Sequence, residues 1–97
     1  MSDIVFEWDD QKALQNQQKH GISFAEAQTV FEDVNARLSY DPDHSRDEDR
    51  YVLLGVSAVL RVLIVCHVYR QNDELIRIIS ARKATKQEQQ QYRRFSS

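Results

Sequence analysis

Arginine residues occur before, within and after two strand-like apolar segments of residues 61–82. A cation on or beside a buried strand is costly unless an anion meets it. Guanidinium groups bind phosphate oxygens as paired donors in a fixed geometry. The pattern therefore indicates a sheet face that binds phosphate groups, with RNA or DNA as the partner.

Cutting RNA without a metal would add a further requirement, which is proton transfer. It needs a group to take the 2′-OH proton, a group to protonate the leaving 5′-oxygen, and cations for the charge building on phosphorus. The side chains that could share these roles are Lys19, His20, Arg61, His67, Arg77 and Arg82. Each also has a structural interpretation: Lys19 and His20 would complement a helix dipole, and a histidine within a sheet can be a satisfied core residue.

The segment 41–49 is an acidic loop that could be mistaken for a cation site. It lacks the mid-loop glycine and the terminal glutamate of an EF-hand, so we expect a solvated loop and no metal. The chain also lacks paired His/Cys zinc spacing, a GxGxxG motif, a P-loop and a GxSxG motif. These absences argue against the common nucleotide-dependent and hydrolytic enzymes, and no cofactor is expected.

The net charge of −2 hides a division along the chain. Residues 1–60 hold five Lys and Arg against twelve Asp and Glu, whereas residues 61–97 hold eight against three. The acidic part could shield the basic face or meet a basic partner. The 97 residues predict one domain, 1–97, with a core small enough to benefit from a covering partner.

Cysteine content and hydropathy indicate the compartment. Cys66 is the only cysteine, and we expect it to be a small buried thiol in a reduced, cytoplasmic environment. The N-terminus has neither a basic segment nor a long apolar one, so no secretory signal is expected. No uncharged apolar run is long enough to span a bilayer, so no membrane partner is expected.

The elements that must position these residues follow from periodicity and turn chemistry. We expect a strand at 4–8, a helix from Asp9 or Asp10 to His20 with Gly21 at its end, and a second helix after the capping box that starts at Ser23. Its stripe Phe24, Ala27, Val30 and Phe31 should be core. Four strands at 37–40, 50–56, 61–70 and 75–81 and a helix from Thr85 to about 95 complete the chain. Short turns between the strands predict an antiparallel sheet, and the order predicts an α+β fold.

Strand alternation suggests which side chains share a face. The set Val62, Ile64, Cys66, Val68 and Arg70 is the more apolar and should pack on the helices. That would leave Arg61 and His67 on an open face. In the last strand Ile76 and Ile78 should face the helices, which would put Arg77 beside His67. A slip of one residue would reverse this arrangement.

The chain resembles the BrnT toxins of bacterial type II toxin–antitoxin systems over nearly its whole length. Two blocks are specific together: Lys-His-Gly-Ile-Ser-Phe at 19–24 and Arg-Ile-Ile-Ser-Ala-Arg-Lys-Ala-Thr at 77–85. The further matching positions are Phe6–Asp9, Ala27, Val30–Phe31, Asp41, His44–Ser45, Arg50–Tyr51, Leu54–Gly55, Arg61–Val65, His67 and Ile76.

The resemblance implies a RelE-like fold and a ribonuclease that cuts RNA without a metal and arrests translation and growth. It also implies a BrnA-like antitoxin with a ribbon-helix-helix DNA-binding module, in a complex of two toxins and two antitoxins. DNA would then be contacted only through the antitoxin. The site residues it favours are those named above for proton transfer and charge, with weaker RNA-binding candidates at Glu48, Arg50, Lys83 and Lys86.

The chain departs from the family pattern in its final helix and in one turn. The helix reads Gln89-Gln90-Gln91 where relatives are often richer in Arg, and the turn 71–74 lacks the usual Gly. Two alternatives to a ribonuclease therefore stand. One is a catalytically inactive toxin homologue that acts as a protein- or nucleic-acid-binding module. The other is a structural interaction domain whose cations only pair with the acidic N-terminal part.

Overall fold

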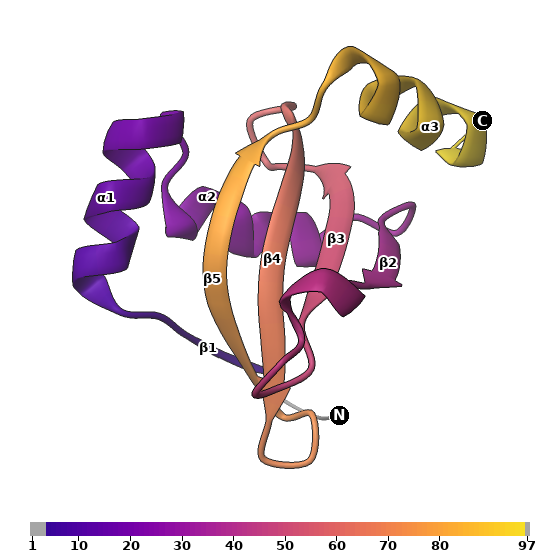
Figure 1. Ribbon diagram of the computed structural model, residues 1–97. Coiled ribbons are helices and arrows are strands. Elements are labelled where there is room, and N and C mark those ends of the chain that lie inside the picture. The colour runs from indigo at the N-terminus through magenta and orange to yellow at the C-terminus, as the bar shows by residue number, and fades with distance from the viewer. Residues whose placement is uncertain (1–3, 97) are drawn as a thin grey trace.

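The computed structural model describes residues 4–96 and shows an α+β fold, as predicted from the sequence. A five-stranded sheet has α2 across one face and α1 alongside strand β5, while α3 lies at one end (Figure 1). The elements are β1 (Val5–Glu7), α1 (Asp10–His20), α2 (Phe24–Thr29), the 3₁₀ helix η1 (Val30–Glu32), β2 (Arg37–Tyr40), the 3₁₀ helix η2 (Pro42–His44), β3 (Tyr51–Val56), β4 (Val62–Arg70), β5 (Leu75–Lys83) and α3 (Lys86–Ser96).

The sheet is mixed, so the prediction of an antiparallel sheet is wrong at one edge. The strand order is β1-β5-β4-β3-β2, and β1 pairs with β5 in parallel while the other pairs are antiparallel. Short turns force β2 to β5 to alternate in direction. β1 is separated from β5 by most of the chain, so no turn fixes its direction.

The main core lies between the sheet and α2. The predicted stripe is confirmed as core, with Phe24, Ala27 and Val30 at most 1% exposed and Phe31 packed against them. The sheet contributes Leu53, Leu63, Val65, Ile78 and Ala81. The face assignment for β4 is therefore wrong: Leu63, Val65 and His67 face the helices. β4 is covered on both faces, because Val62 and Ile64 pack toward Tyr92 of α3. Its residues are therefore apolar on both faces, and their alternation does not show which face meets the helices.

A β-bulge in the last hairpin changes which side chains share a face. Cys66 pairs with Ser80 but His67 pairs with Ile78, which leaves Ile79 as the extra residue. Arg77 and Arg82 are five positions apart, so a regular strand would place them on opposite faces. The bulge restores them to one face, turned away from α2. The predicted juxtaposition of Arg77 with His67 is consequently wrong.

Helix caps formed largely where the sequence predicted them. Gly21 adopts a left-handed conformation at φ 72° and donates its N–H to Gln17 O at 2.8 Å. Thr85 and Glu88 exchange both bonds of a capping box. Ser23 accepts from the Glu26 amide, but the Glu26 carboxylate turns away to Arg61 and Ser57 instead of closing its box.

Candidate nucleic-acid interface

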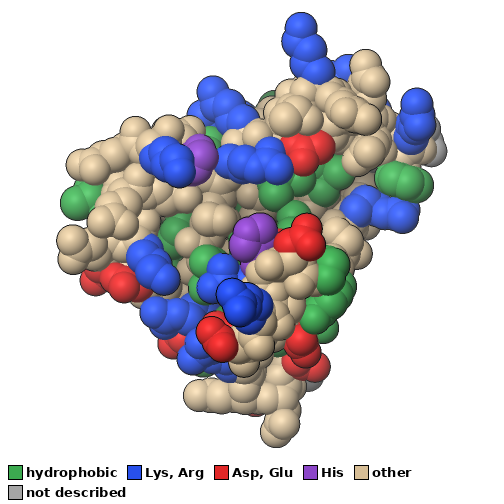
Figure 2. Space-filling view, viewed as in Figure 1, with side chains coloured by type: hydrophobic (Ala, Val, Ile, Leu, Met, Phe, Trp, Pro, Cys, Tyr) green, Lys and Arg blue, Asp and Glu red, His purple; other side chains and the backbone are tan. Residues whose placement is uncertain are grey.

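The sheet face turned away from α2 carries the cluster of cations. We call it the outer face, and by register it presents Cys66 of β4 together with Arg77, Ser80 and Arg82 of β5. Lys, Arg and His side chains gather over this side of the molecule in Figure 2. Helix α3 packs over one end of this face through Tyr92, so apolar packing covers only part of the face.

The loop between β2 and β3 folds back across the outer face, as Figure 1 shows for η2. Its ends are tied because Asp41 N donates to Arg50 O at 2.9 Å. Ser45 Oγ donates to Asp41 O at 2.5 Å and accepts from Arg50 N at 2.9 Å. The Arg50 guanidinium lies near enough to the Cys66 thiol of β4 to act on its charge, so the loop and the strand meet at this point. Most of the loop is exposed, as expected of a solvated segment, although it folds back over the sheet.

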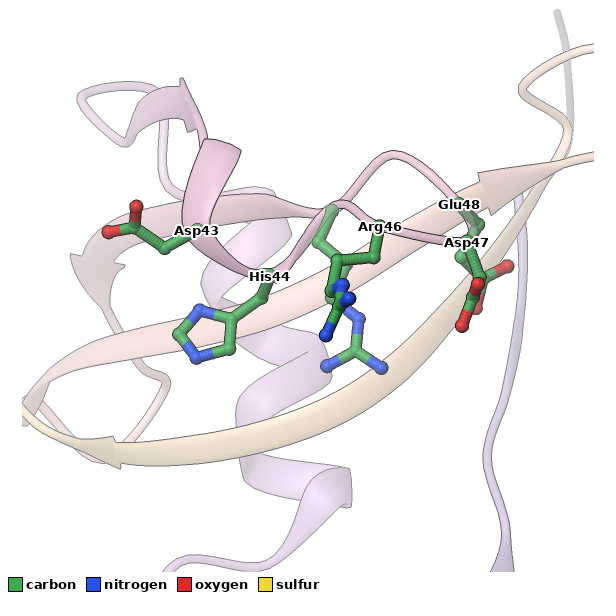
Figure 3. Close-up of a pocket in the computed structure, with 6 residues that line it drawn as sticks. Asp43, His44, Arg46, Asp47 and Glu48 are labelled. Carbon is green, nitrogen blue, oxygen red and sulfur yellow. The ribbon is translucent and has the colours of Figure 1, made fainter.

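A hollow of about 250 Å³ opens within this loop. Figure 3 shows His44 and Arg46 projecting to the same side of the loop, while the Asp43 carboxylate points away. The residues that line the hollow are Asp43, His44, Arg46, Asp47, Glu48 and Arg50. Glu48 is engaged by Arg70 of β4 at 3.0 Å, so one of the three carboxylates is neutralised.

A second hollow, of about 320 Å³, lies between α1 and β5 and brings Lys19 and His20 to Ser80. Asn16, only 7% exposed, fixes this geometry. Its amide donates to Ile22 O at 3.0 Å and to Ala81 O at 2.8 Å, and its Oδ1 accepts from Ala81 N at 3.1 Å. The last turn of α1 is thereby held against the strand just beyond the bulge.

The two hollows are joined across the sheet by Cys66. Its thiol lies beside both Ser80, which lines the hollow of Lys19 and His20, and Arg50, which lines the hollow of His44. Burial raises the pKa of the Cys66 thiol, and the nearby Arg50 only partly offsets this. The thiol is half-buried rather than buried as expected, so it forms part of the surface. A path of polar and cationic groups thus crosses the outer face.

Four arginines of the basic C-terminal part are held in ion pairs. Arg77 meets Glu7 at 2.9 Å, and Arg70 meets Glu48. Arg82 binds both oxygens of Glu88 at 2.8 and 3.0 Å, and this lowers the pKa of Glu88 to about 2 despite partial burial. The fourth pair, between Arg61 and Glu26, is described next. Exposed pairs of this kind contribute only about 0–1 kcal/mol, so a polyanion can compete for the arginines.

Three of the predicted site residues lie elsewhere. Arg61 binds Glu26 of α2 through both carboxylate oxygens, which lowers the pKa of Glu26. Lys83 lines a separate hollow with Arg61 beside the start of β4. His67 is 0% exposed in the core, with Nδ1 near Val65 O at 3.1 Å and Nε2 near Tyr69 Oη at 3.2 Å. Burial lowers the pKa of His67, and RNA at the surface does not reach its ring.

The structure also reveals a polar pair that the sequence reasoning missed. His44 Nδ1 lies 2.9 Å from Asp41 Oδ2, and the two side chains are 67% and 19% exposed. The spacing of three residues within an acidic loop was the available signal, but it is equally typical of a solvated segment. Lys86, the last of the weaker candidates, is exposed at the start of α3.

Neither a metal cluster nor a membrane-spanning helix is found among residues 4–96. Within that range no three His, Cys, Asp or Glu side chains are grouped so that they could hold a metal ion. None of the described helices has the length and apolar character needed to cross a bilayer.

Comparison with known proteins identifies the family. A family model described as the ribonuclease toxin, BrnT, of type II toxin-antitoxin systems matches residues 8–88. No curated protein matches the chain. The crystal structure of the Brucella abortus ribonuclease toxin, BrnT, is similar at 25% sequence identity and a TM-score of 0.62, over 89% of this chain and 100% of that one. The resemblance predicted from the sequence is confirmed, and the chain belongs to the BrnT family of ribonuclease toxins of type II toxin–antitoxin systems.

Proposed function

We propose that this chain, as one toxin domain of residues 1–97, is a metal-independent endoribonuclease that cuts RNA on its outer face. In the cytoplasm such an activity would inhibit translation and arrest growth. The observation that carries the proposal is the path from Lys19 and His20 through Ser80 and Cys66 to Arg50. It combines groups that can transfer protons with cations that can bind a phosphate, on one accessible surface.

The roles follow from position. The positively charged side chains of Arg50 and Arg82 bind the phosphate. Arg82 becomes available for this contact when the RNA backbone displaces Glu88. Arg77 contributes a further phosphate contact at the β1 edge of the same face. Lys19 and His20 serve the ribose or the leaving oxygen from the end of α1. Arg61, Lys83 and His67 are assigned structural roles, because their contacts place them off this path.

Membership of a type II toxin–antitoxin family implies an antitoxin partner. We propose that this partner is BrnA-like, carries a ribbon-helix-helix module and assembles as two antitoxins with two toxins. DNA would be contacted only by that module. The wider RelE-like classification stays a prediction.

The test uses a labelled DNA oligonucleotide that carries one ribonucleotide, incubated with the purified chain in EDTA. Attack by a 2′-OH predicts a single cut at the ribonucleotide and none in the all-DNA strand. Arg50→Ala should lower the cleavage rate on the order of a hundredfold, as loss of a charge-stabilising donor does. Arg37→Ala, a change on edge strand β2, is the matched control and should cut normally. Cleavage abolished by EDTA would contradict metal independence.

One observation favours a second function, that of an inactive homologue that only binds. The ion pairs of Arg77 and Arg82 occupy cations that the proposed ribonuclease would need. Such a protein would bind the same oligonucleotide in a salt-dependent manner and leave it uncut. Turnover therefore separates the two functions, whereas affinity does not.

A further inference from the structure

We propose that His44, oriented by Asp41, is the general base that takes the 2′-OH proton, and this inference rests on the proposed ribonuclease function. The pair is the one place on the outer face where a carboxylate holds an imidazole, among the residues that the structure describes. His44 Nδ1 and Asp41 Oδ2 are 2.9 Å apart. An Nδ1–H donated to the carboxylate leaves Nε2 without a proton and able to accept one.

The carboxylate of this pair is fixed, whereas the imidazole is accessible. The Asp41 side chain is 19% exposed and that of His44 is 67% exposed. The backbone on both sides of Asp41 is held, because its N–H donates to Arg50 O and its carbonyl accepts from Ser45 Oγ. The Asp41 carboxylate thus holds one nitrogen of a ring that lines the hollow and is largely exposed, so a substrate can reach the ring.

The neighbours of His44 provide what the reaction needs beside a base. Arg46 projects to the same side of the loop, and Arg50 lines the same hollow and reaches Cys66 of β4 (Figure 3). A phosphate bound by these guanidinium groups would bring the adjacent ribose within reach of the imidazole. The other charged groups that line the hollow are Asp43, Asp47 and Glu48 of the loop, with Arg70 of β4 on Glu48.

The chemical step balances without a metal or other co-reactant. Nε2 of neutral His44 takes the 2′-OH proton as the 2′-oxygen attacks phosphorus and forms the new P–O2′ bond. The P–O5′ bond breaks, and the departing 5′-oxygen takes a proton from water. The imidazolium, stabilised by Asp41, then gives its proton back to the solvent. The products carry a 2′,3′-cyclic phosphate and a 5′-hydroxyl.

The experiment compares single-turnover cleavage of RNA across pH by the wild type, His44→Gln and Asp41→Asn. His44→Gln should lower the rate by about 10²–10⁴-fold and remove the rise in rate that accompanies deprotonation of the base. Asp41→Asn should lower it at least about tenfold through loss of orientation. Asp43→Asn is the matched control, because it removes a neighbouring carboxylate that points away from the ring.

Two further readouts separate a proton-transfer role from a structural or binding one. Affinity for a 2′-deoxy-substituted strand should stay within about twofold of the wild-type value in His44→Gln, since a base contributes to rate rather than to ground-state binding. Added imidazole should restore part of the activity of His44→Ala, which a folding defect would not allow.

The outcomes distinguish this inference from the function on which it rests. Wild-type cleavage in EDTA together with a His44→Gln rate within about threefold of wild type would overturn the role of His44 and leave the ribonuclease standing. Loss of affinity in proportion to rate would overturn it as well. A wild-type chain that binds RNA and cuts none would overturn the proposed function and this inference together.

Discussion

His67 is a fully buried histidine in a cluster of aromatic rings. Its ring packs edge-on against Phe31 and Tyr69, with centroids 4.8 and 5.0 Å apart. Burial lowers the pKa of the imidazole, and the hydrogen bond with the Val65 carbonyl offsets only part of that effect. The neutral ring is therefore the form that the fold stabilises.

This burial predicts a dependence of stability on pH. A histidine whose pKa is lowered by folding contributes its full stability above the unfolded-state value of about 6.5, and the contribution is lost as the pH falls below it. We expect His67→Phe to flatten the decline in the free energy of unfolding between about pH 7 and 5, measured by urea denaturation. His20→Gln, at the end of α1, should leave the decline in place. If the free energy of unfolding of His67→Phe fell with decreasing pH as steeply as that of the wild type, His67 would not be the source of the decline.

The types of the site residues could be predicted from the sequence, but not all of their environments. Arginine within apolar strands indicated phosphate contacts, and Arg77 and Arg82 do lie on the outer face. His67 was predicted to lie on the open face of the sheet, but it lies on the face covered by the helices. The prediction failed because its strand is apolar on both faces. His44 was missed, because a histidine three residues after an aspartate in an acidic loop gives no sign of how the loop folds.

The elements that carry the site depend on a few buried polar contacts. Asn16 makes three hydrogen bonds with the backbone at Ile22 and Ala81, and these hold α1 to β5. Lys19 and His20 occupy the same helix and reach Ser80 only in that position. A single buried amide thus connects the stability of α1 with the geometry of the second hollow.

Removing that amide should affect both stability and function. We expect Asn16→Ala to lower the free energy of unfolding by about 2–3 kcal/mol, because buried backbone groups at Ala81 lose their partner. Cleavage should fall as well, since α1 is no longer fixed on the strand. Gln18→Ala, an exposed change on the same helix, should cost less than about 0.5 kcal/mol. Equal unfolding midpoints for both variants would show that the Asn16 bonds are not what holds the helix.

A part-buried hydrogen bond, from Tyr92 Oη to Asp33 Oδ2 at 2.6 Å, helps to hold helix α3 against the rest of the molecule. Burial is the first cause that raises the pKa of Tyr92 to about 12, and Asp33 adds to it. Burial alone would raise the pKa of Asp33, but hydrogen bonds from Tyr92, Val56 and Asn35 bring it below its usual value. The pair thus joins the C-terminal helix to the loop after η1.

The raised pKa of Tyr92 predicts alkaline weakening of the fold. Its stabilisation is complete below an unfolded-state pKa of about 10 and is lost as the pH rises through the folded value of about 12. Tyr92→Phe should lose about 1–2 kcal/mol at neutral pH and show less further decline at alkaline pH in urea denaturation. Tyr40→Phe, on the exposed edge strand, serves as the control. The same alkaline decline in Tyr92→Phe would exclude this tyrosine as its source.

Secondary structure was largely predictable because its signals are local. Strand β2 and the helix ends at Gly21 and Thr85 formed where turn and capping chemistry placed them. The bulge at Ile79 and the parallel pairing of β1 were not predictable, because both are set by contacts between distant segments. The bulge puts Arg77 and Arg82 on one face, and the pairing of β1 sets Glu7 beside Arg77. The residue types of the candidate site could therefore be predicted further than their arrangement.

The whole molecule folds its acidic and basic parts onto one another. Glu7, Glu26 and Glu48 of the acidic part each engage an arginine of the basic part. These partly exposed pairs keep the arginines in place at little cost, and a phosphate backbone can displace the carboxylates. Under the proposed function, this charge division gives a surface that a phosphate backbone can occupy, and membership of a ribonuclease toxin family is consistent with that proposal.

The most direct test of this account is the chemistry of the ends produced when the purified chain cuts RNA in EDTA. Attack by the 2′-OH predicts a 2′,3′-cyclic phosphate on one product and a 5′-hydroxyl on the other, identified by mass spectrometry. Their loss in Arg50→Ala and persistence in Arg37→Ala would place the reaction on the outer face. A 5′-phosphate with a free 3′-hydroxyl would contradict the account, because such ends arise from attack by water rather than by the ribose.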